Sequence, residues 1–179
     1  MQAVRGKLLF EHAAPHGGAL NIYDAEDQMD ERARMLQDIL EGNDGFIALL
    51  GIEFIEAGKD YAVSRIKIER KHMNANGTVQ GGCLYAMADS TGVASCASDN
   101  RIGPTLNGQL YFTHSTNGAS EIFCRAQVVK NGRTVKIADA VITDDSGREI
   151  ARGTFQYFIS QTIENLGENG RALAPVTDR

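Results

Sequence analysis

The segment HMNANGTVQGGCLYAMAD, residues 72–89, carries the strongest structural and chemical signals in the chain. The stretch 71–79 is polar and rich in turn-forming residues, which predicts a loop. The residues that follow are mostly small or apolar, and they predict a helix over about 80–98. Gly92 and several hydroxyl side chains would weaken this helix in isolation. Small residues suit a helix whose backbone must lie close under a sheet, so we place it there.

The chain before this segment predicts a helix and two strands. Met29, Ala33, Leu36 and Leu40 recur at helical spacing, and Gly42 supplies a stop. After the apolar stretch Phe46–Leu50, alternation predicts strands at about 52–57 and 61–69, with a turn at Gly58–Asp60 between them.

The chain after this segment predicts strands alone. Apolar and polar residues alternate over four runs, and Asn131-Gly132 predicts a hairpin between the second and the third. Val135, Ile137 and Val141 fall on one face of the third run. Strands grouped apart from helices indicate an α+β fold with an antiparallel sheet. The four runs are about 106–112, 122–128, 135–141 and 148–159.

Composition and charge narrow the class of protein. The 179 residues carry a net charge of −5, which argues against a nucleic-acid partner because neutralising phosphates requires a basic face. The longest apolar run, 46–52, is too short to cross a membrane. The N-terminus lacks a signal-peptide pattern, and the three cysteines form no CxxC motif. We therefore expect a cytoplasmic protein with reduced thiols and no membrane partner.

The same signals predict one folded body, residues 26–160. Residues 1–25 are expected to form an irregular N-terminal arm, and residues 161–179 a flexible C-terminal tail. The four histidines suggest no metal site, since His12 and His16 are separated by Pro15 and have no obvious acidic partner.

Three features of residues 72–89 can carry chemistry. Gly81 and Gly82 open the helix, where bare N–H groups attract anions and a missing Cβ lets a carbonyl approach; the alternative is an ordinary glycine pair. Asp89 lies in mid-helix, where a poorly hydrated carboxylate can act as base or nucleophile, unless it is exposed or capped. Asn74 could orient a water or a carbonyl, or could serve as a turn residue.

Together these residues resemble the signature of hotdog-fold acyl-CoA thioesterases, and most nearly the phenylacetic-acid-degradation type. The resemblance covers about 46–158 and includes the Gly-Thr-x-x-Gly-Gly loop at 77–82, Asp89 eight residues after Gly81, and the hairpin 130–133. It implies a hotdog fold, with an antiparallel β-sheet wrapped around a long central helix. It also implies hydrolysis of an acyl-CoA thioester without a cofactor, CoA being part of the substrate.

The resemblance implies roles for individual residues. Asp89 would be the general base or nucleophile, and the Gly81 N–H would polarise the thioester carbonyl. Asn74 would help to place the water or the carbonyl, and Thr105 matches a position that can carry a hydroxyl near the water. The expected CoA contacts come from the helix start and from the segments 112–117 and 130–135: Gly82, Phe112, His114, Ser115, Lys130, Gly132 and Arg133. Lys130 and Arg133 would face the phosphates, unless they form a solvated hairpin tip.

Two positions depart from the family pattern. Gln80, a candidate catalytic-site residue, stands where the family usually has histidine, and glutamine can hydrogen-bond but cannot titrate. Val93 stands where some relatives have a hydroxyl one turn after the carboxylate. Both departures favour the main alternative, a non-catalytic acyl-CoA-binding hotdog protein. A hotdog dehydratase or hydratase is a further alternative, but it would have His and several prolines at the site, and only Pro104 lies nearby.

The spacing of Gly81 and Asp89 bears on assembly. Eight residues of helix span about 12 Å, whereas catalysis needs a reacting distance of about 3 Å. An antiparallel copy of the helix from a second subunit would bring its Asp89 opposite Gly81. We therefore expect a homodimer, and the resemblance implies that dimers pair into a homotetramer. The sequence does not identify the acyl group, and Tyr85 and Met87 are candidates to line its pocket.

Overall fold

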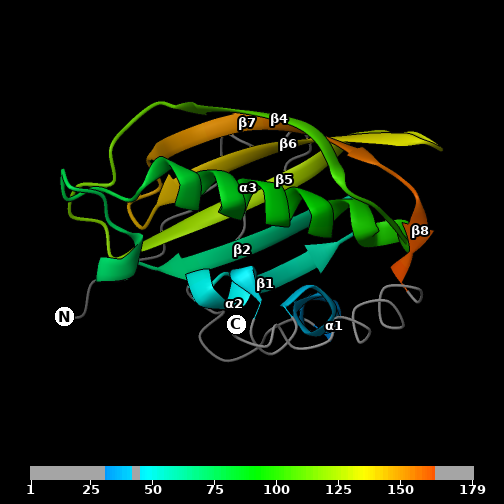
Figure 1. Cartoon of the computed structure of the whole chain (residues 1–179), viewed down its shortest axis with the longest axis horizontal. Coiled ribbons are helices and arrows are strands. Elements are labelled where there is room, and N and C mark those ends of the chain that lie inside the picture. Colours follow the sequence, from blue (N-terminus) through cyan, green and yellow to red (C-terminus); the bar gives the residue numbers. More distant parts are fainter. Residues whose placement is uncertain (1–30, 42–44, 164–179) are drawn as a thin grey trace, which may run out of the picture.

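An antiparallel sheet curves around one long helix in the computed structural model, which describes residues 31–41 and 45–163 (Figure 1). The helix, α3 (Gly81–Cys96), continues into a short 3-10 turn, η3 (Ala97–Asp99). The strands of the main sheet run in the order β1-β2-β5-β6-β7-β4, and each pairs antiparallel with its neighbours. They are β1 (Glu53–Gly58), β2 (Tyr61–Lys67), β4 (Thr105–Phe112), β5 (Glu121–Asn131), β6 (Val135–Asp144) and β7 (Glu149–Phe158). The predicted sheet around a central helix is confirmed.

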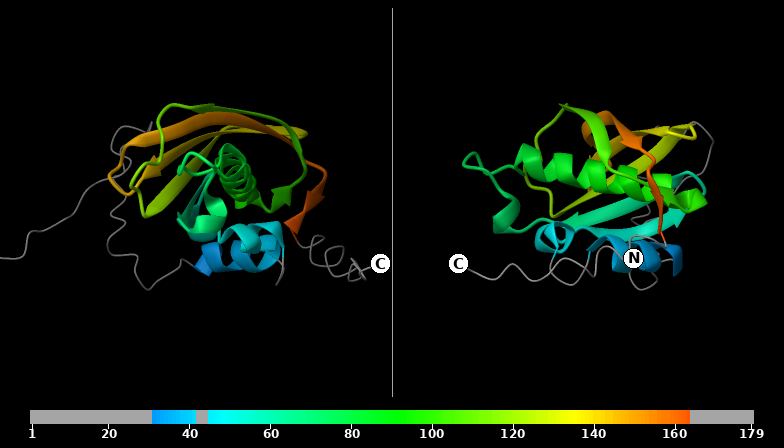
Figure 2. Two further views of the ribbon diagram at one scale, coloured as in Figure 1. Left: turned by 60° about the vertical axis from the view of Figure 1, so that its left-hand side comes forward. Right: turned by 45° about the vertical axis from the view of Figure 1, so that its right-hand side comes forward.

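The small residues of α3 let the sheet approach its backbone. In the left-hand view of Figure 2, α3 is seen nearly end-on inside the curve of the sheet. It packs against β2, β5 and β6, and most of its apolar side chains are buried. The inner face of β5 is the one that alternation predicts, with Ile122, Cys124 and Ala126 fully buried. Burial on several sides explains why α3 lacks the polar face of an ordinary surface helix.

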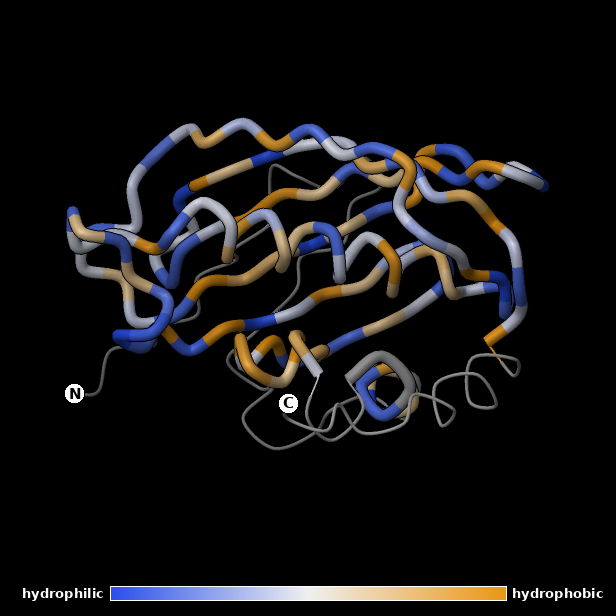
Figure 3. The backbone as a smooth tube through the Cα atoms, in the orientation of Figure 1, coloured by the Kyte–Doolittle hydropathy of each residue, from blue (hydrophilic) through white to orange (hydrophobic). Residues whose placement is uncertain are grey.

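Two further helices, α1 (Glu31–Glu41) and α2 (Phe46–Leu50), pack beside β1 and α3: α1 contacts β1, and α2 contacts α1 and α3. Helix α1 buries Ala33 and Leu36, which lie in one cluster with Phe54 of β1, and it exposes Arg34. Helix α2 is almost wholly hydrophobic in Figure 3 and ends at Gly51, whose φ of 62° is a left-handed cap conformation that glycine adopts without strain. Met29 and Gly42, the expected limits of the first helix, lie outside the described residues.

The buried face of β6 is not the one that its apolar residues suggest. Val135, Ile137 and Val141 do share a face, but they are only half-buried. The opposite face lies against α3 and buries Ala138, Ala140, Ile142 and, less expectedly, the whole side chain of Lys136. A lysine normally marks a solvent-facing position, so alternation alone cannot reveal this face.

A second, two-stranded sheet closes the fold. Strand β3 (Arg101–Ile102) pairs with β8 (Gln161–Thr162), and Ile163 is buried in the same cluster as Ile102. The packed chain therefore extends three residues past the expected boundary at 160. The N-terminal arm, residues 1–25, and the tail beyond 163 lie outside the described residues, so the division into arm, body and tail stays a prediction. Among the described helices, none has the length and apolar character needed to cross a membrane.

Candidate functional site

The N-terminal end of α3 leaves one backbone donor open. Gln80 caps the helix, and its side-chain Oε1 accepts a hydrogen bond from the Gly82 N–H. Within the described part of the chain, the Gly81 N–H donates to no acceptor. First-turn N–H groups and the helix dipole together favour negative charge at this end. Gly81 is therefore the donor available to a carbonyl that develops negative charge.

A pocket of about 440 Å³ opens beside Gly81. Asn74, Gly81, Phe112, His114 and Ser115, which the sequence places in separate segments, all line it. The other lining residues are Thr78, Val79, Leu84, Thr113 and Thr116. The lining mixes hydroxyl, amide and imidazole groups with apolar side chains, so the pocket suits a ligand segment that has both polar and apolar parts.

Asn74 holds its own loop in shape. Its Oδ1 accepts hydrogen bonds from the N–H groups of Asn76 and Thr78, at 2.9 and 3.2 Å, and its Nδ2 donates to Thr78 Oγ1 at 2.9 Å. This geometry is the turn alternative that the sequence leaves open, because the amide oxygen is already engaged. Asn74 therefore shapes the pocket wall.

Histidine 72 anchors the start of the same loop. Its Nδ1 accepts a hydrogen bond from the Glu69 N–H, and its Nε2 lies 2.9 Å from the carbonyl oxygen of Leu50, to which it donates. Its own carbonyl accepts from the Gln80 N–H at 2.8 Å. His72 thus ties the end of α2 to the residue that caps α3.

The opposite wall, residues 113–116, is fixed by the start of β7 and by the loop. The N–H groups of Thr113 and His114 both donate to the Ile150 carbonyl, and the His114 Nδ1 donates to the Glu149 carbonyl at 2.8 Å. The Thr116 side chain accepts from the Val79 N–H at 2.8 Å. These contacts join the two walls, so the pocket is preformed in a single chain.

Asp89 is half-buried on α3 and is held by hydroxyl groups. The Thr105 Oγ1 donates to Asp89 Oδ1 at 2.8 Å. Burial raises the pKa of Asp89 above its ordinary value, while the hydrogen bond from the Thr105 hydroxyl opposes that rise. A carboxylate with a raised pKa is a better proton acceptor than an exposed one. Thr105 contacts the carboxylate directly, which makes it a residue that positions Asp89.

Tyr157 is a member of this site that sequence reasoning missed. It is 1% exposed, and its hydroxyl donates to the backbone carbonyl of Asp89 at 3.1 Å. Its hydroxyl fits because residue 92 is glycine: a Cβ there would lie 1.9 Å from the tyrosine oxygen. Gly92 was the available signal. A glycine inside a helix costs stability, so its presence indicates that another group needs the space that a side chain would fill.

One face of α3 runs along the edge strand β4. Three contacts join them, in antiparallel register: Gly81 with Phe112, Tyr85 with Gly108, and Asp89 with Thr105. Gly81, Tyr85 and Asp89 follow one another at intervals of four residues, so they lie on one face of the helix. We call this line of contacts the α3–β4 seam.

Within one chain the two ends of the seam are too far apart to act on one carbonyl. Eight residues of helix separate the Gly81 N–H from Asp89 by about 12 Å along the axis. The structure therefore places a donor and a carboxylate on the same face but does not bring them together in a single subunit.

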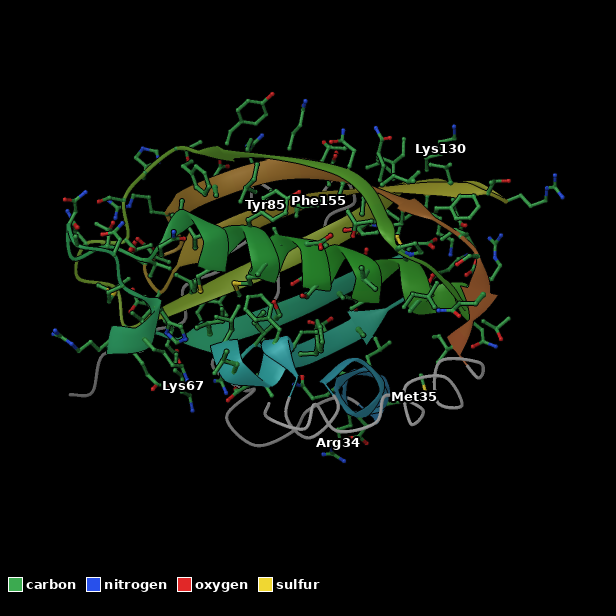
Figure 4. All side chains as sticks on the ribbon, in the orientation of Figure 1. Arg34, Met35, Lys67, Tyr85, Lys130 and Phe155 are labelled. Atoms are coloured by element: carbon green, nitrogen blue, oxygen red, sulfur yellow. The ribbon has the colours of Figure 1, made fainter. Side chains whose placement is uncertain are left out.

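The remaining predicted residues lie at the other end of α3. Lys130 and Arg133 are exposed on the β5–β6 hairpin, and Figure 4 shows Lys130 far from the start of α3. The carbonyls of Gly132 and Arg133 accept hydrogen bonds from Arg101, which follows the C-terminal end of α3. A helix of 16 residues spans about 24 Å, so this hairpin does not reach the pocket of its own chain.

Other reactive side chains near the pocket are poorly suited to catalysis. Cys83 lies two residues from Gly81, but burial raises the pKa of its thiol to about 11, so it is protonated at neutral pH. The Thr91 hydroxyl, near Asp89 in the chain, is buried and bonded to Ser64 and to the Met87 carbonyl. In the described residues, His, Cys, Asp and Glu side chains form no cluster of three that could hold a metal.

Comparisons with known proteins agree with this architecture. The model of the family described as Thioesterase superfamily matches residues 76–151. A relative named putative esterase Rv1847, from Mycobacterium tuberculosis, is 30% identical over 114 residues, which cover 60% of this chain and 81% of that protein. Acyl-coenzyme A thioesterase 13 of Mus musculus is 24% identical over 129 residues, which cover 70% of this chain and 92% of that protein. The solved structure of the E. coli PaaI protein, from the phenylacetic acid degradation operon, superposes with a TM-score of 0.66 at 21% sequence identity. The match covers 75% of this chain and 99% of that one.

The chain belongs to the thioesterase superfamily, a family of hydrolases. The expected hotdog fold and the expected enzyme class are confirmed at this level. The resemblance to the phenylacetic-acid-degradation type is supported as a likeness of fold alone.

Proposed function

We propose that the protein hydrolyses an acyl-CoA thioester with water, at a site that two subunits share. The Gly81 N–H of one subunit polarises the thioester carbonyl, and Asp89 of the partner subunit acts as general base or nucleophile. The observation that carries this proposal is the α3–β4 seam, which presents an open N–H and a half-buried carboxylate on one face about 12 Å apart.

The unpaired side of β4 supplies a way to complete the site. Among the described strands, β4 pairs with β7 alone and lies at the edge of the sheet. Leu106 and Phe112 on this strand are more than half exposed. An exposed edge strand with large apolar side chains is a surface that pairs readily with another strand. Two-fold pairing there would set the two α3 helices antiparallel and bring the partner's Asp89 to Gly81.

In the general-base form of the reaction, the partner's Asp89 takes a proton from a water molecule. The water oxygen bonds to the thioester carbon, and the negative charge that develops on the carbonyl oxygen is stabilised by the Gly81 N–H and the helix dipole. The carbon–sulfur bond then breaks, CoA leaves as a thiolate that is protonated, and the free acid remains. In the nucleophilic form, Asp89 bonds to the thioester carbon and the carbon–sulfur bond breaks, so that CoA leaves as a thiolate that is protonated. Water then cleaves the resulting mixed anhydride to the free acid and the Asp89 carboxylate.

The pocket beside Gly81 is proposed to take the pantetheine arm of CoA. Its mixture of hydroxyl and apolar groups matches the polar groups and the hydrocarbon segments of that arm. Antiparallel helices would also bring the partner's hairpin to this end, so that Lys130 and Arg133 reach the phosphates. The mouse relative's name specifies acyl-coenzyme A, which supports this substrate class. Assembly as a homodimer paired into a homotetramer, membership of the phenylacetic-acid-degradation type of thioesterase and a cytoplasmic location belong to the same proposal.

A non-catalytic acyl-CoA-binding protein is the second candidate. Gln80 stands where the family usually has histidine, and its side-chain oxygen accepts a hydrogen bond from the Gly82 N–H. Val93 packs against both hydrophobic clusters and supplies no hydroxyl. Release of free CoA thiol distinguishes the two candidates, because binding alone produces none.

The test compares thiol release by the wild type and by Asp89→Asn, with Asp139→Asn as the matched control. Loss of the basic oxygen should lower kcat/KM about 100-fold or more, because a general base contributes a factor of that size. Asp139 is exposed on the far face of the sheet and should tolerate the same change. Retention of more than a tenth of the activity in Asp89→Asn would refute the assignment. A wild type that binds acyl-CoA but releases no thiol would support the second candidate.

A further inference from the structure

Tyr85 lies at the centre of the α3–β4 seam, between the two catalytic groups. It is four residues from Gly81 and four from Asp89, or about 6 Å along the helix from each. Met87, the other residue suggested for the acyl pocket, is fully buried in the main core. Tyr85 is 37% exposed, so part of its ring is open on the active face.

The Tyr85 ring is fixed by contacts on β4 and β7. Its hydroxyl donates to the Gly108 carbonyl at 3.3 Å, and its ring meets Phe155 edge-on with 5.2 Å between centroids. Figure 4 shows the two rings together between α3 and the sheet. Gly108 makes room for the hydroxyl, because a Cβ at that position would lie 2.4 Å from it. A ring held in this way acts as a rigid wall.

The direction of the acyl group follows from the two substituents of the thioester carbon. With the carbonyl oxygen at the Gly81 N–H, the sulfur and the CoA arm extend into the pocket on the loop side. The acyl group must then extend to the other side, along the seam, where Tyr85 is the next side chain on this face of α3.

Two-fold symmetry places a second tyrosine at the same point. If the partner's Asp89 lies opposite Gly81 on an antiparallel helix, the residue midway between them, Tyr85, faces the partner's Tyr85. The pair would then form a wall between the two active sites.

We propose that Tyr85 limits the length of the acyl group and makes the protein a thioesterase for short acyl groups. This inference rests on the proposed function and adds the substrate class. Removing the ring should lengthen the space available on each side of the two-fold axis.

The experiment measures kcat/KM for a series of straight-chain acyl-CoA substrates, from acetyl to dodecanoyl, with Tyr85→Ala, Tyr85→Leu and Tyr85→Phe. The wild type should prefer the short end. Tyr85→Ala should raise the ratio of decanoyl to butanoyl kcat/KM about tenfold or more, which is the discrimination expected of a pocket wall. Tyr85→Leu, which keeps an apolar contact with Phe155, should shift the ratio less, and Tyr85→Phe should keep the wild-type profile.

The matched control is Tyr111→Ala, on β4 but lining a pocket on the outer face of the sheet. It should leave the chain-length profile unchanged. A wild type that prefers dodecanoyl-CoA, or Tyr85→Ala and Tyr85→Leu variants that are active with an unshifted profile, would overturn the inference while leaving the proposed function intact. A wild type that releases no thiol from any substrate in the series would overturn both.

Discussion

The two ends of α3 differ in whether their polar groups have hydrogen-bond partners within the chain. At the C-terminal end, the buried Lys136 Nζ donates to the Cys96 carbonyl at 2.6 Å and to Asp99 Oδ1 at 2.5 Å. Asp99 also pairs with Arg101, which bonds to the neighbouring hairpin. At the N-terminal end, the Gly81 N–H has no acceptor among the described residues. The end where Lys136, Asp99 and the Cys96 carbonyl partner one another holds the fold, and the end with an open donor is where a substrate can bind.

Lys136→Met, at the C-terminal end of α3, should have the largest effect on stability, and it should leave catalysis in place. The change leaves a buried carbonyl without its donor and Asp99 without one partner, at a cost of about 2 kcal/mol or more. Chemical denaturation measures this loss. Lys130→Met, the same change at an exposed lysine, should alter stability little, and an equal loss in both variants would contradict the structural role of Lys136.

The stability effect of Lys136 should also depend on pH. Burial alone would raise the pKa of Asp99, but hydrogen bonds from Arg101 and Lys136 outweigh it and hold the pKa below its ordinary value. A lowered folded-state pKa stabilises the protein above the unfolded value, and that contribution is lost as the pH falls through the folded value. The gap between Lys136→Met and wild type should therefore be smaller near about pH 3 than at neutral pH.

The functional end is tested by Thr105→Val, which should lower kcat/KM about tenfold through misplacement of Asp89. The Thr105 hydrogen bond opposes the burial that raises the Asp89 pKa, so its loss raises that pKa further. Because the base must be ionised, the acid side of the pH profile should move to higher pH. Thr154→Val removes a similar bond to Asp139 on the outer face and should change neither quantity. A profile that does not move would show that Thr105 leaves Asp89 unaffected.

The smallest effect is expected at the hairpin. The double variant Lys130→Ala, Arg133→Ala should raise KM for acyl-CoA about fivefold with little change in kcat, because exposed charges bind ground and transition states alike. Acyl-pantetheine substrates, which lack the nucleotide, should not respond. Equal changes with both substrates would argue against contact between these residues and the phosphates.

Local sequence signals predicted the candidate site at the N-terminal end of α3 but not the ion pairs at its C-terminal end. Gly81, Gly82 and Asp89 lie within one short segment, so their spacing already defines a helix start and a carboxylate on one face. Asn74 could be read from the sequence as a turn residue or as a group that places the water or the carbonyl, and its hydrogen bonds show the turn contacts. The alternating strands and the hairpin at Asn131-Gly132 were visible for the same reason, because each depends on neighbours in the chain.

The missed features depend on contacts between distant segments. Tyr157 reaches Asp89 across 68 residues, and its role follows from the space over Gly92. Lys136 on β6 can be buried because its ammonium group donates to Asp99 and to the Cys96 carbonyl at the end of α3. Strands β3 and β8 have two residues each, too few for a periodic pattern.

The central claim, that each active site takes Gly81 from one subunit and Asp89 from the other, can be tested with two inactive variants. Asp89→Ala lacks the carboxylate, and Gly81→Pro lacks the N–H. Proline is tolerated in a first helical turn, and the preceding residue, Gln80, is already extended with φ −65° and ψ 133°. A Cβ at position 81 would lie 3.1 Å from the ring of Phe112, so that ring must move by only a few tenths of an ångström.

The measurement is the thiol-release activity of an equal mixture of the two variants, unfolded and refolded together. Random pairing makes about half of the dimers mixed, and each mixed dimer has one intact site of two, so the mixture should recover roughly a quarter of wild-type activity. Each variant refolded alone should remain inactive. A mixture as inactive as its parents, with mixed dimers confirmed by mass spectrometry, would contradict the shared site.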